Sequence, residues 1–101
     1  MHNRLKLHEK LVRILGSRNV YFQPPETIKM NYPCIVYERY DINNTHADDD
    51  VYLSECQYRV TVIDADPDSE VVEKIAKLRK CRFIRHIVVD NLNHDTFSIY
   101  Y

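Results

Sequence analysis

The sequence predicts one α+β domain in which two helices pack on one face of a mostly antiparallel sheet of four or five strands. Its 101 residues are a common size for a single domain. Two segments carry apolar residues at helical spacing, and several others are rich in β-branched and aromatic residues. The composition, 45% hydrophobic and 29% charged with one glycine, is typical of an ordered globular chain. We therefore expect residues 1–101 to fold as one domain with the element order α-β-β-β-α-β-β.

The first helix is predicted over residues 4–15, where apolar side chains recur at three- and four-residue spacing. The residues on that apolar face are Leu7, Leu11, Ile14 and Leu15. Gly16 follows, at the position where a helix C-terminus favours glycine. Residues 19–23 then form a short predicted strand, which ends at Pro24-Pro25 because proline cannot donate a hydrogen bond to a sheet.

Two longer strands are predicted over residues 34–40 and 52–64, both rich in β-branched and aromatic residues. In the second strand alternate residues are apolar, so one face should lie in the core and the other in water. The predicted core-facing residues are Cys56, Tyr58, Val60 and Val62. Between the strands, the polar stretch Asp41-Ile-Asn-Asn-Thr-His-Ala-Asp-Asp-Asp50 has almost nothing to bury. We expect it to be an exposed hairpin loop at about residues 41–51.

A second helix is predicted to start at Asp66-Pro67, because aspartate accepts hydrogen bonds at an N-cap and proline fits the first helical position. The helix should end near Lys80 or Cys81. Its predicted buried stripe is Val71, Val72, Ile75, Ala76 and Leu78. Residues 82–90 and 96–101 should then pair as a hairpin around a connection at residues 91–95.

Charged residues are segregated along the chain, although the net charge is only −1. Residues 1–18 carry five basic and one acidic side chain (+4), and residues 38–70 carry two basic and ten acidic ones (−8). Residues 71–86 carry six basic and one acidic side chain (+5). Opposed potentials orient docking, so the pattern suits a self-associating subunit. The alternative is that solvated helix faces are basic and loops acidic.

No metal site is predicted. Asp64, Asp66 and Asp68 have the spacing that opens a calcium loop, but Ser69 stands at the sixth position and Ile75 at the twelfth, where the motif needs Gly and Glu. A helix N-terminus explains these acids better. His46 with the aspartates at 48–50 could gather a divalent cation, but a solvated acidic loop is the favoured interpretation.

No catalytic site or cofactor is predicted either. His86 and His94 flank the last hairpin and could approach each other, but neither has a partner group that would make it a general base. The cysteines 34, 56 and 81 are interpreted as small hydrophobes, and their odd number favours a reducing compartment. A single glycine excludes a phosphate-binding loop.

The chain is expected to act away from membranes. Its first residues lack the uninterrupted apolar core of a secretory signal, and no apolar run reaches the length of a membrane span. A sequence pI of about 6.5 is unlike the basic domains that bind duplex DNA. A small nucleic-acid-binding module therefore remains only as an alternative.

The last third of the chain, Arg85-His86-Ile-Val-Val-Asp90-Asn-Leu-Asn-His94-Asp-Thr-Phe-Ser-Ile-Tyr-Tyr101, resembles the C-terminal hairpin of a phage protein family. This family is the tail-completion, or tail-terminator, family of long-tailed bacteriophages (siphophages) of Gram-positive hosts. Asn19-Val-Tyr-Phe-Gln-Pro-Pro and Tyr32-Pro-Cys-Ile-Val-Tyr-Glu38 are similar to its central region. The resemblance covers most of residues 19–101. Ile87 stands where members often carry an aromatic residue.

The resemblance implies a structural virion protein of the tail and neck, assembled in the cytoplasm of the bacterial host, and not an enzyme. Such a protein forms a ring, usually a homohexamer, that caps the head-proximal end of the tail tube and ends its polymerisation. Its partners would be further copies of itself, the major tail-tube protein and the head-completion or connector protein. DNA would pass through the lumen without sequence-specific binding. The alternative within this class is another neck component, such as a head-completion or adaptor protein.

Two sets of residues are candidates for assembly. A cyclic ring needs two different patches that meet between neighbours. The predicted loop is a candidate arm towards the tail tube or a neighbour, and its residues are Asp41, Asn43, Asn44, His46, Asp48, Asp49 and Asp50. The candidate basic residues that would face these acids in a neighbouring subunit are Lys74, Lys77 and Arg82.

Overall fold

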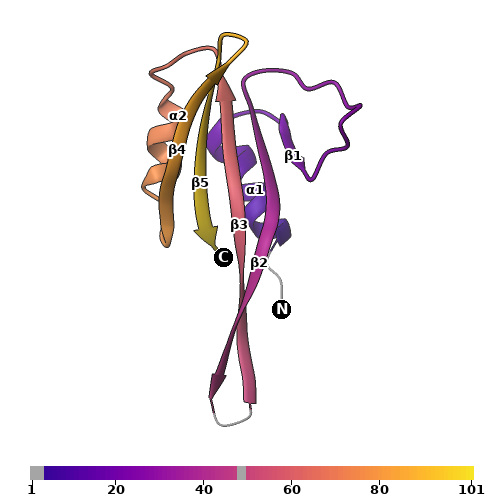
Figure 1. The fold of residues 1–101 in the computed structure, drawn as a ribbon, viewed down its shortest axis with the longest axis vertical. Coiled ribbons are helices and arrows are strands. Elements are labelled where there is room, and N and C mark those ends of the chain that lie inside the picture. The colour runs from indigo at the N-terminus through magenta and orange to yellow at the C-terminus, as the bar shows by residue number, and fades with distance from the viewer. Residues whose placement is uncertain (1–3, 48–49) are drawn as a thin grey trace.

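The computed structural model describes residues 4–47 and 50–101, with side chains for residues 4–40 and 56–101. The elements along the chain are α1 (Arg4–Leu15), β1 (Val20–Phe22), β2 (Cys34–Ala47), β3 (Asp50–Asp64), α2 (Glu70–Ala76), β4 (Cys81–Val89) and β5 (Leu92–Tyr100). The strands form one sheet in the order β1-β2-β3-β5-β4 (Figure 1). β1 and β4 therefore lie at the two edges.

The predicted α+β class and the mostly antiparallel pairing are confirmed. Strands β2, β3, β5 and β4 pair antiparallel in turn. The sheet is nevertheless mixed, because β1 pairs in parallel with β2, with Val20 opposite Ile35. This parallel pairing needs a connection that returns the chain to the same end of the sheet, and residues 23–33 supply it.

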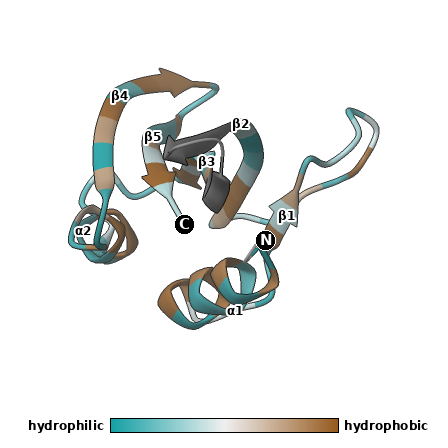
Figure 2. Ribbon diagram, turned by 90° about the horizontal axis from the view of Figure 1, so that it is seen from below, coloured by the Kyte–Doolittle hydropathy of each residue, from teal (hydrophilic) through white to brown (hydrophobic). Residues whose placement is uncertain are grey.

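The core lies between the sheet and the two helices, which sit on the same side of the sheet (Figure 2). α1 contributes Leu7 and Leu11, and α2 contributes Ile75, all fully buried. The sheet contributes the predicted face of β3 together with residues of β2 and β5. These fully or almost fully buried residues are Ile35, Tyr37, Cys56, Tyr58, Val60, Val62, Phe97 and Ile99.

The first helix has the predicted residues and the predicted end. Gly16 has a φ of +81°, a left-handed conformation that a residue with a side chain rarely adopts. Its N–H donates to the Val12 carbonyl at 2.8 Å, which satisfies one of the last carbonyls of α1. The helix therefore stops here and the chain turns towards β1.

The second helix starts later than the sequence predicted. Its N-cap is Ser69, whose hydroxyl accepts a hydrogen bond from the Val71 N–H at 3.2 Å. Asp66 caps a turn instead: its carboxylate accepts from the Asp68 N–H at 2.9 Å, and the Asp64 carboxylate accepts from the Asp66 N–H at the same distance. Aspartate stabilises such turns as readily as helix starts, so the local residues alone do not distinguish the two.

The second helix also ends earlier than predicted. It stops at Ala76, with Lys77 as its C-cap, because the chain has to turn before it enters β4 at Cys81. Of the predicted buried stripe, Ile75 is fully buried and Ala76 is exposed. The remaining members, Val71, Val72 and Leu78, are partly buried against the core.

The β4–β5 hairpin turns at Asp90-Asn91, and the prediction of a connection at residues 91–95 was wrong. Both turn residues have positive φ, 51° and 65°, which is the type I′ geometry that matches the twist of a hairpin. Aspartate and asparagine tolerate this conformation better than most residues. Residues 92–95 are therefore strand, and Asp95 lies opposite His86.

Residues 41–47 and 50–55 are strand, and the predicted loop at about 41–51 was wrong. Asp41, Asn43, Asn44 and His46 lie in β2, and Asp50 begins β3. Asp48 and Asp49 lie outside the described residues. Antiparallel strands satisfy each other's backbone groups, so pairing can continue without apolar side chains, and pairs such as Asn43 with Glu55 extend the hairpin.

We call residues 41–55 the ribbon; the structure describes residues 41–47 and 50–55 of it. The ribbon begins where the sheet narrows to two strands, because Tyr100, near the end of β5, lies opposite Gln57 of β3. From there it runs away from the body of the domain (Figure 1). The molecule is consequently long, 50 Å against 27 and 23 Å in the other directions.

Neither described helix is long and apolar enough to span a lipid bilayer.

Candidate assembly surface

The edge strand β4 exposes an unusual number of apolar side chains. Eight of its nine residues are exposed, and the first is partly buried. The large apolar residues among them are Phe83, Ile84, Ile87, Val88 and Val89, with exposed fractions from 42% to 59%. We call these five residues the β4 patch. They account for five of the nine large apolar residues that are exposed in the described part of the chain.

The β4 patch lies on a strand whose outer side has no neighbouring strand among the described residues. β4 pairs only with β5, and the register shifts between Phe83 and Arg85, a local bulge. Free strand edges attract other chains, and proteins usually shorten or charge them. β4 has Arg82, Arg85 and His86 between its apolar residues, but it is nine residues long and keeps its apolar side chains accessible.

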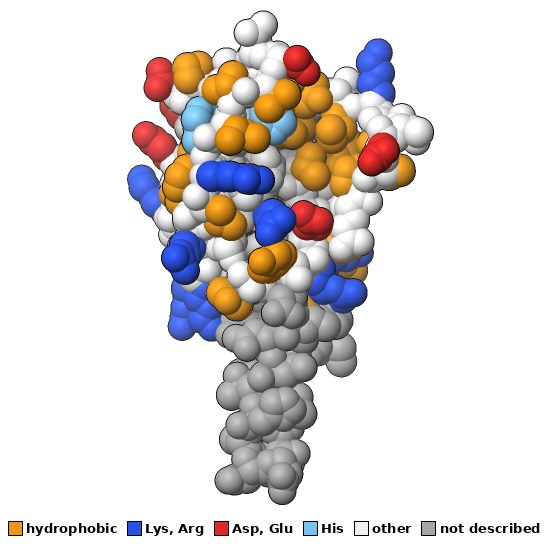
Figure 3. All heavy atoms as spheres, viewed as in Figure 1, with side chains coloured by type: hydrophobic (Ala, Val, Ile, Leu, Met, Phe, Trp, Pro, Cys, Tyr) orange, Lys and Arg blue, Asp and Glu red, His pale blue; other side chains and the backbone are white. Residues whose placement is uncertain are grey.

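The β4 patch spans both faces of the sheet. Phe83 lies opposite Phe97 and contacts its ring edge-on, with ring centroids 5.5 Å apart, so it extends the core outwards. Because side chains alternate along a strand, Ile87 and Val89, opposite His94 and Leu92, face the side without helices. Apolar side chains on that side are visible in Figure 3.

A shallow hollow of about 370 Å³ adjoins the β4 patch on the side of the sheet away from the helices. Phe83 and Ile84 line it from β4, and Arg82, Tyr40 and Arg59 line it as well. The Arg59 guanidinium lies 4.3 Å from the centre of the Tyr40 ring and 3.8 Å from the Glu38 carboxylate. Exposed aromatic and arginine side chains around an apolar patch are typical of protein interfaces.

The predicted basic interface residues do not form one surface. Lys74 is exposed on α2 and Lys77 at its C-cap, whereas Arg82 lies opposite Ser98, on the side of the sheet away from the helices. Of the acids predicted to face them, Asp48 and Asp49 lie outside the described residues. The β4 patch itself was missed, although the run Ile87-Val88-Val89 was visible. Such a run normally indicates a buried strand, and only the strand order shows that it lies at an edge.

His86 and His94, which could have approached each other, lie on opposite faces of the strand pair. His86 lies opposite Asp95, and its Nδ1 is 2.7 Å from the Asp95 carboxylate. His94 lies opposite Ile87, on the other face of the strand pair. A histidine beside a carboxylate can act as a general base that the carboxylate orients. His86 and Asp95, however, line neither of the two described pockets.

His8 and Tyr37 form a polar pair under α1. The His8 Nδ1 lies 2.7 Å from the Tyr37 hydroxyl, and an Arg4 nitrogen lies 3.5 Å from the same hydroxyl. Burial lowers the pKa of His8 below 6.5, and the positive charge of Arg4 lowers it further. Burial also raises the pKa of Tyr37 above 10.0. The pair is therefore held neutral at neutral pH, which suits a structural contact between α1 and β2.

None of the described cysteines is in a disulfide; Cys34 and Cys56 are buried and Cys81 is half-buried. Burial raises the pKa of Cys34 and of Cys81 to about 11, so both are poor nucleophiles at neutral pH. Cys56 is fully buried in the core. Among the described residues there is no group of three or more His, Cys, Asp or Glu that could hold a metal ion.

Comparisons with known proteins add no relative to this picture: no family model matches the chain, and neither curated proteins nor solved structures provide a match.

Proposed function

We propose that this chain is a structural subunit of a bacteriophage virion, which forms a ring at the head-proximal end of the tail tube. The β4 patch is the observation that carries the proposal. A nine-residue edge strand with five exposed apolar side chains risks aggregation in a free monomer but suits a subunit whose edge is covered by a neighbour. The resemblance of the C-terminal hairpin to tail-completion proteins supplies the place of the ring in the virion.

The subunit offers distinct surfaces for distinct contacts, as a ring requires. A closed ring uses one patch on each subunit to meet a different patch on the next. The β4 patch lies at one sheet edge, and the ribbon projects along the long axis of the domain (Figure 1). A neighbouring copy would cover the β4 patch, and the tail tube and the head connector would contact the two ends of the ring.

The ring would end tube polymerisation and join the tail to the head, with DNA passing through its lumen. No catalytic step is part of this role. The high pKa of the Cys34 and Cys81 thiols keeps both protonated at neutral pH, so neither is activated as a nucleophile.

The test is assembly of the purified chain, measured by sedimentation velocity with and without the major tail-tube protein. We expect a ring-sized species in at least one of the two conditions. The double variant Ile87→Lys/Val89→Lys should stay monomeric, because two charges would have to be buried in the contact. Circular dichroism should show an unchanged fold, since both side chains are exposed in the monomer.

A matched control places the same two charges elsewhere. Ile28 and Tyr32 are exposed to a similar degree, 40% and 47%, but lie in the connection between β1 and β2. Ile28→Lys/Tyr32→Lys should assemble like the wild type. A wild-type chain that stays monomeric in both conditions would refute the proposal. Binding to the head connector but not to the tail-tube protein would instead identify a different neck component.

A further inference from the structure

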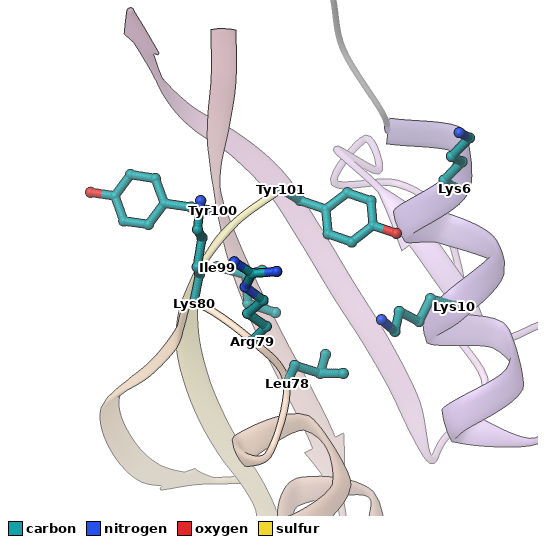
Figure 4. A pocket seen from close by; sticks show the side chains of 8 residues that line it. All are labelled: Lys6, Lys10, Leu78, Arg79, Lys80, Ile99, Tyr100 and Tyr101. Carbon is teal, nitrogen blue, oxygen red and sulfur yellow. The ribbon is translucent and has the colours of Figure 1, made fainter. Parts of the chain in front are cut away.

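A second surface, distinct from the β4 patch, is a pocket of about 450 Å³ between α1 and the segment that leads into β4. Four cationic side chains line it: Lys6 and Lys10 from α1, and Arg79 and Lys80 from the other wall (Figure 4). Its apolar lining includes Leu78 and Tyr101. We call it the cationic pocket. No described residue that lines it is acidic.

The arrangement of the cationic pocket suits an anionic partner with some apolar surface. Lys10, which is partly buried, points towards the Tyr101 ring, with its Nζ 5.9 Å from the ring centre, so a cation and an apolar ring lie side by side in the pocket (Figure 4). Lys6, Lys10 and Arg79 bring like charges to one hollow, and a partner with carboxylates would offset their mutual repulsion.

The ribbon has the complementary composition. Residues 41–55 carry five carboxylates, at positions 41, 48, 49, 50 and 55, and no lysine or arginine. The three consecutive aspartates are followed by Val51, Tyr52 and Leu53, so the same segment offers apolar side chains next to its charges. A segment of this composition matches a hollow with cationic walls and an apolar lining.

The described backbone of the ribbon, residues 41–47 and 50–55, leads away from the cationic pocket of its own chain (Figure 1). The pocket lies at the root of the ribbon, because Tyr101 lines it and also exchanges backbone hydrogen bonds of 3.0 and 3.2 Å with Cys56. From this root the strand pairing directs the ribbon away from the body (Figure 1). The seven residues 41–47 extend for about 23 Å at the usual rise of a strand. A cationic pocket that the outer part of the ribbon could contact would therefore belong to another copy of the chain.

We propose that the ribbon of one copy docks in the cationic pocket of a second copy. The inference rests on the proposed self-assembly and names the contact. The ribbon and the pocket are different patches, so the contact can repeat around a ring. It also accounts for the ribbon itself, because an isolated two-stranded hairpin is only marginally stable in water and gains from a supporting surface.

A nucleic acid is the competing occupant of a cationic pocket, and the observations favour the protein. The ribbon starts beside the pocket, and its five carboxylates would repel a phosphate backbone that approached along it. The chain as a whole has a net charge of −1, without the excess of positive charge that non-specific DNA binding uses.

Two charge-reversed variants of the full chain test the contact. The first reverses the ribbon, Asp48→Lys/Asp49→Lys/Asp50→Lys, and the second reverses the pocket, Lys6→Glu/Lys10→Glu/Arg79→Glu. Each variant alone should self-associate at least about tenfold more weakly than the wild type, because like charges would then meet in every contact. An equimolar mixture should recover assembly, because each ribbon then meets a pocket of opposite charge. Sedimentation velocity measures all three samples.

The control variant Arg13→Glu/Arg18→Glu/Lys29→Glu makes the same change of charge at exposed residues that do not line the pocket. It should assemble like the wild type. Raising the salt concentration from about 0.1 M to about 1 M should weaken wild-type assembly, because the screening length falls from about 10 to about 3 Å. If the pocket variant does not fold by circular dichroism, Lys10→Gln/Arg79→Gln replaces it.

The outcomes separate the contact from the function. If the wild type assembles but the mixture of variants does not, the ribbon does not dock in the pocket, although the ring proposal stands. If the pocket variant loses affinity for a short fluorescent DNA duplex while it assembles normally, the pocket serves nucleic acid and the inference is overturned. If the wild type never assembles, both proposals fail together.

Discussion

The two edges of the sheet are built in opposite ways. β1 is three residues long, and its apolar side chains pack against the core. Val20 is 6% exposed. The centre of the Phe22 ring lies 4.9 Å from the centre of the Tyr37 ring and 4.5 Å from the Arg4 guanidinium carbon. β4 is nine residues long and leaves eight of them exposed. One edge is too short to recruit another strand, and the other is long and apolar.

The difference fits the proposal that a second copy covers β4. A short edge that is held by its own helix contributes to the stability of the monomer. A long edge strand whose side chains are mostly outside the monomer core buries apolar surface only when another molecule covers it. Stability and assembly should therefore respond to substitutions at different edges.

Replacing one phenylalanine at each edge tests this division most strongly. Phe22→Ala should lower the free energy of unfolding by about 2–3 kcal/mol and should leave assembly intact. The loss is smaller than for a fully buried ring because Phe22 is half-buried. Phe83→Ala should cost less than about 1 kcal/mol, because its ring is 52% exposed, and should weaken assembly. Urea unfolding and sedimentation measure the two quantities. The division fails if Phe83→Ala destabilises the monomer as much as Phe22→Ala.

The cap of α2 sharpens the comparison on the β4 side, because α2 packs next to β4. Ser69→Ala should cost about 1 kcal/mol, since the Val71 N–H loses its hydrogen-bond partner at the helix start. Asp66→Ala should change stability by less than about 0.5 kcal/mol, because its carboxylate serves an exposed turn. Thermal melting of the two variants measures the difference. Equal melting temperatures would contradict the assignment of Ser69 as the cap.

The smallest effect is expected from pH, on the β1 side. The pKa of His8 is below 6.5 in the folded chain, so the unfolded chain binds more protons once the pH falls below 6.5. The contribution of neutral His8 to the free energy of unfolding should therefore be fully present above pH 6.5. It should decrease as the pH falls towards the pKa of folded His8. His8→Gln should melt with a weaker dependence on pH between about 7.5 and 5.5. An unchanged dependence would mean that other groups determine it.

Features set by neighbouring residues were predictable from the sequence. The helix over 4–15 follows from its apolar period and from Gly16, and the core face of β3 follows from alternation. The turn of the last hairpin was misplaced because residues 91–95 have the composition of a loop. The two-residue turn at Asp90-Asn91 leaves the rest of that stretch free to pair with β4.

Features set by distant residues were not predictable in the same way. Whether residues 41–47 form a strand depends on a partner strand that pairs with them, and their polar composition indicated a loop. Whether Ile87-Val88-Val89 is buried depends on which strand lies at the edge. The cationic pocket brings together Lys6 and Arg79, which are 73 positions apart. Charge counts along the chain therefore showed that two segments are basic but not that they meet at one pocket.

The protonated state of the native thiols makes this chain convenient for a fluorescence assay. Maleimide dyes react with the thiolate, so Cys34 and Cys81, with pKa values of about 11, should label slowly, and buried Cys56 should be shielded. A dye introduced through Val88→Cys, where the native side chain is 59% exposed, would then report on the β4 edge alone. Its emission would follow subunit joining in real time without removal of any native cysteine.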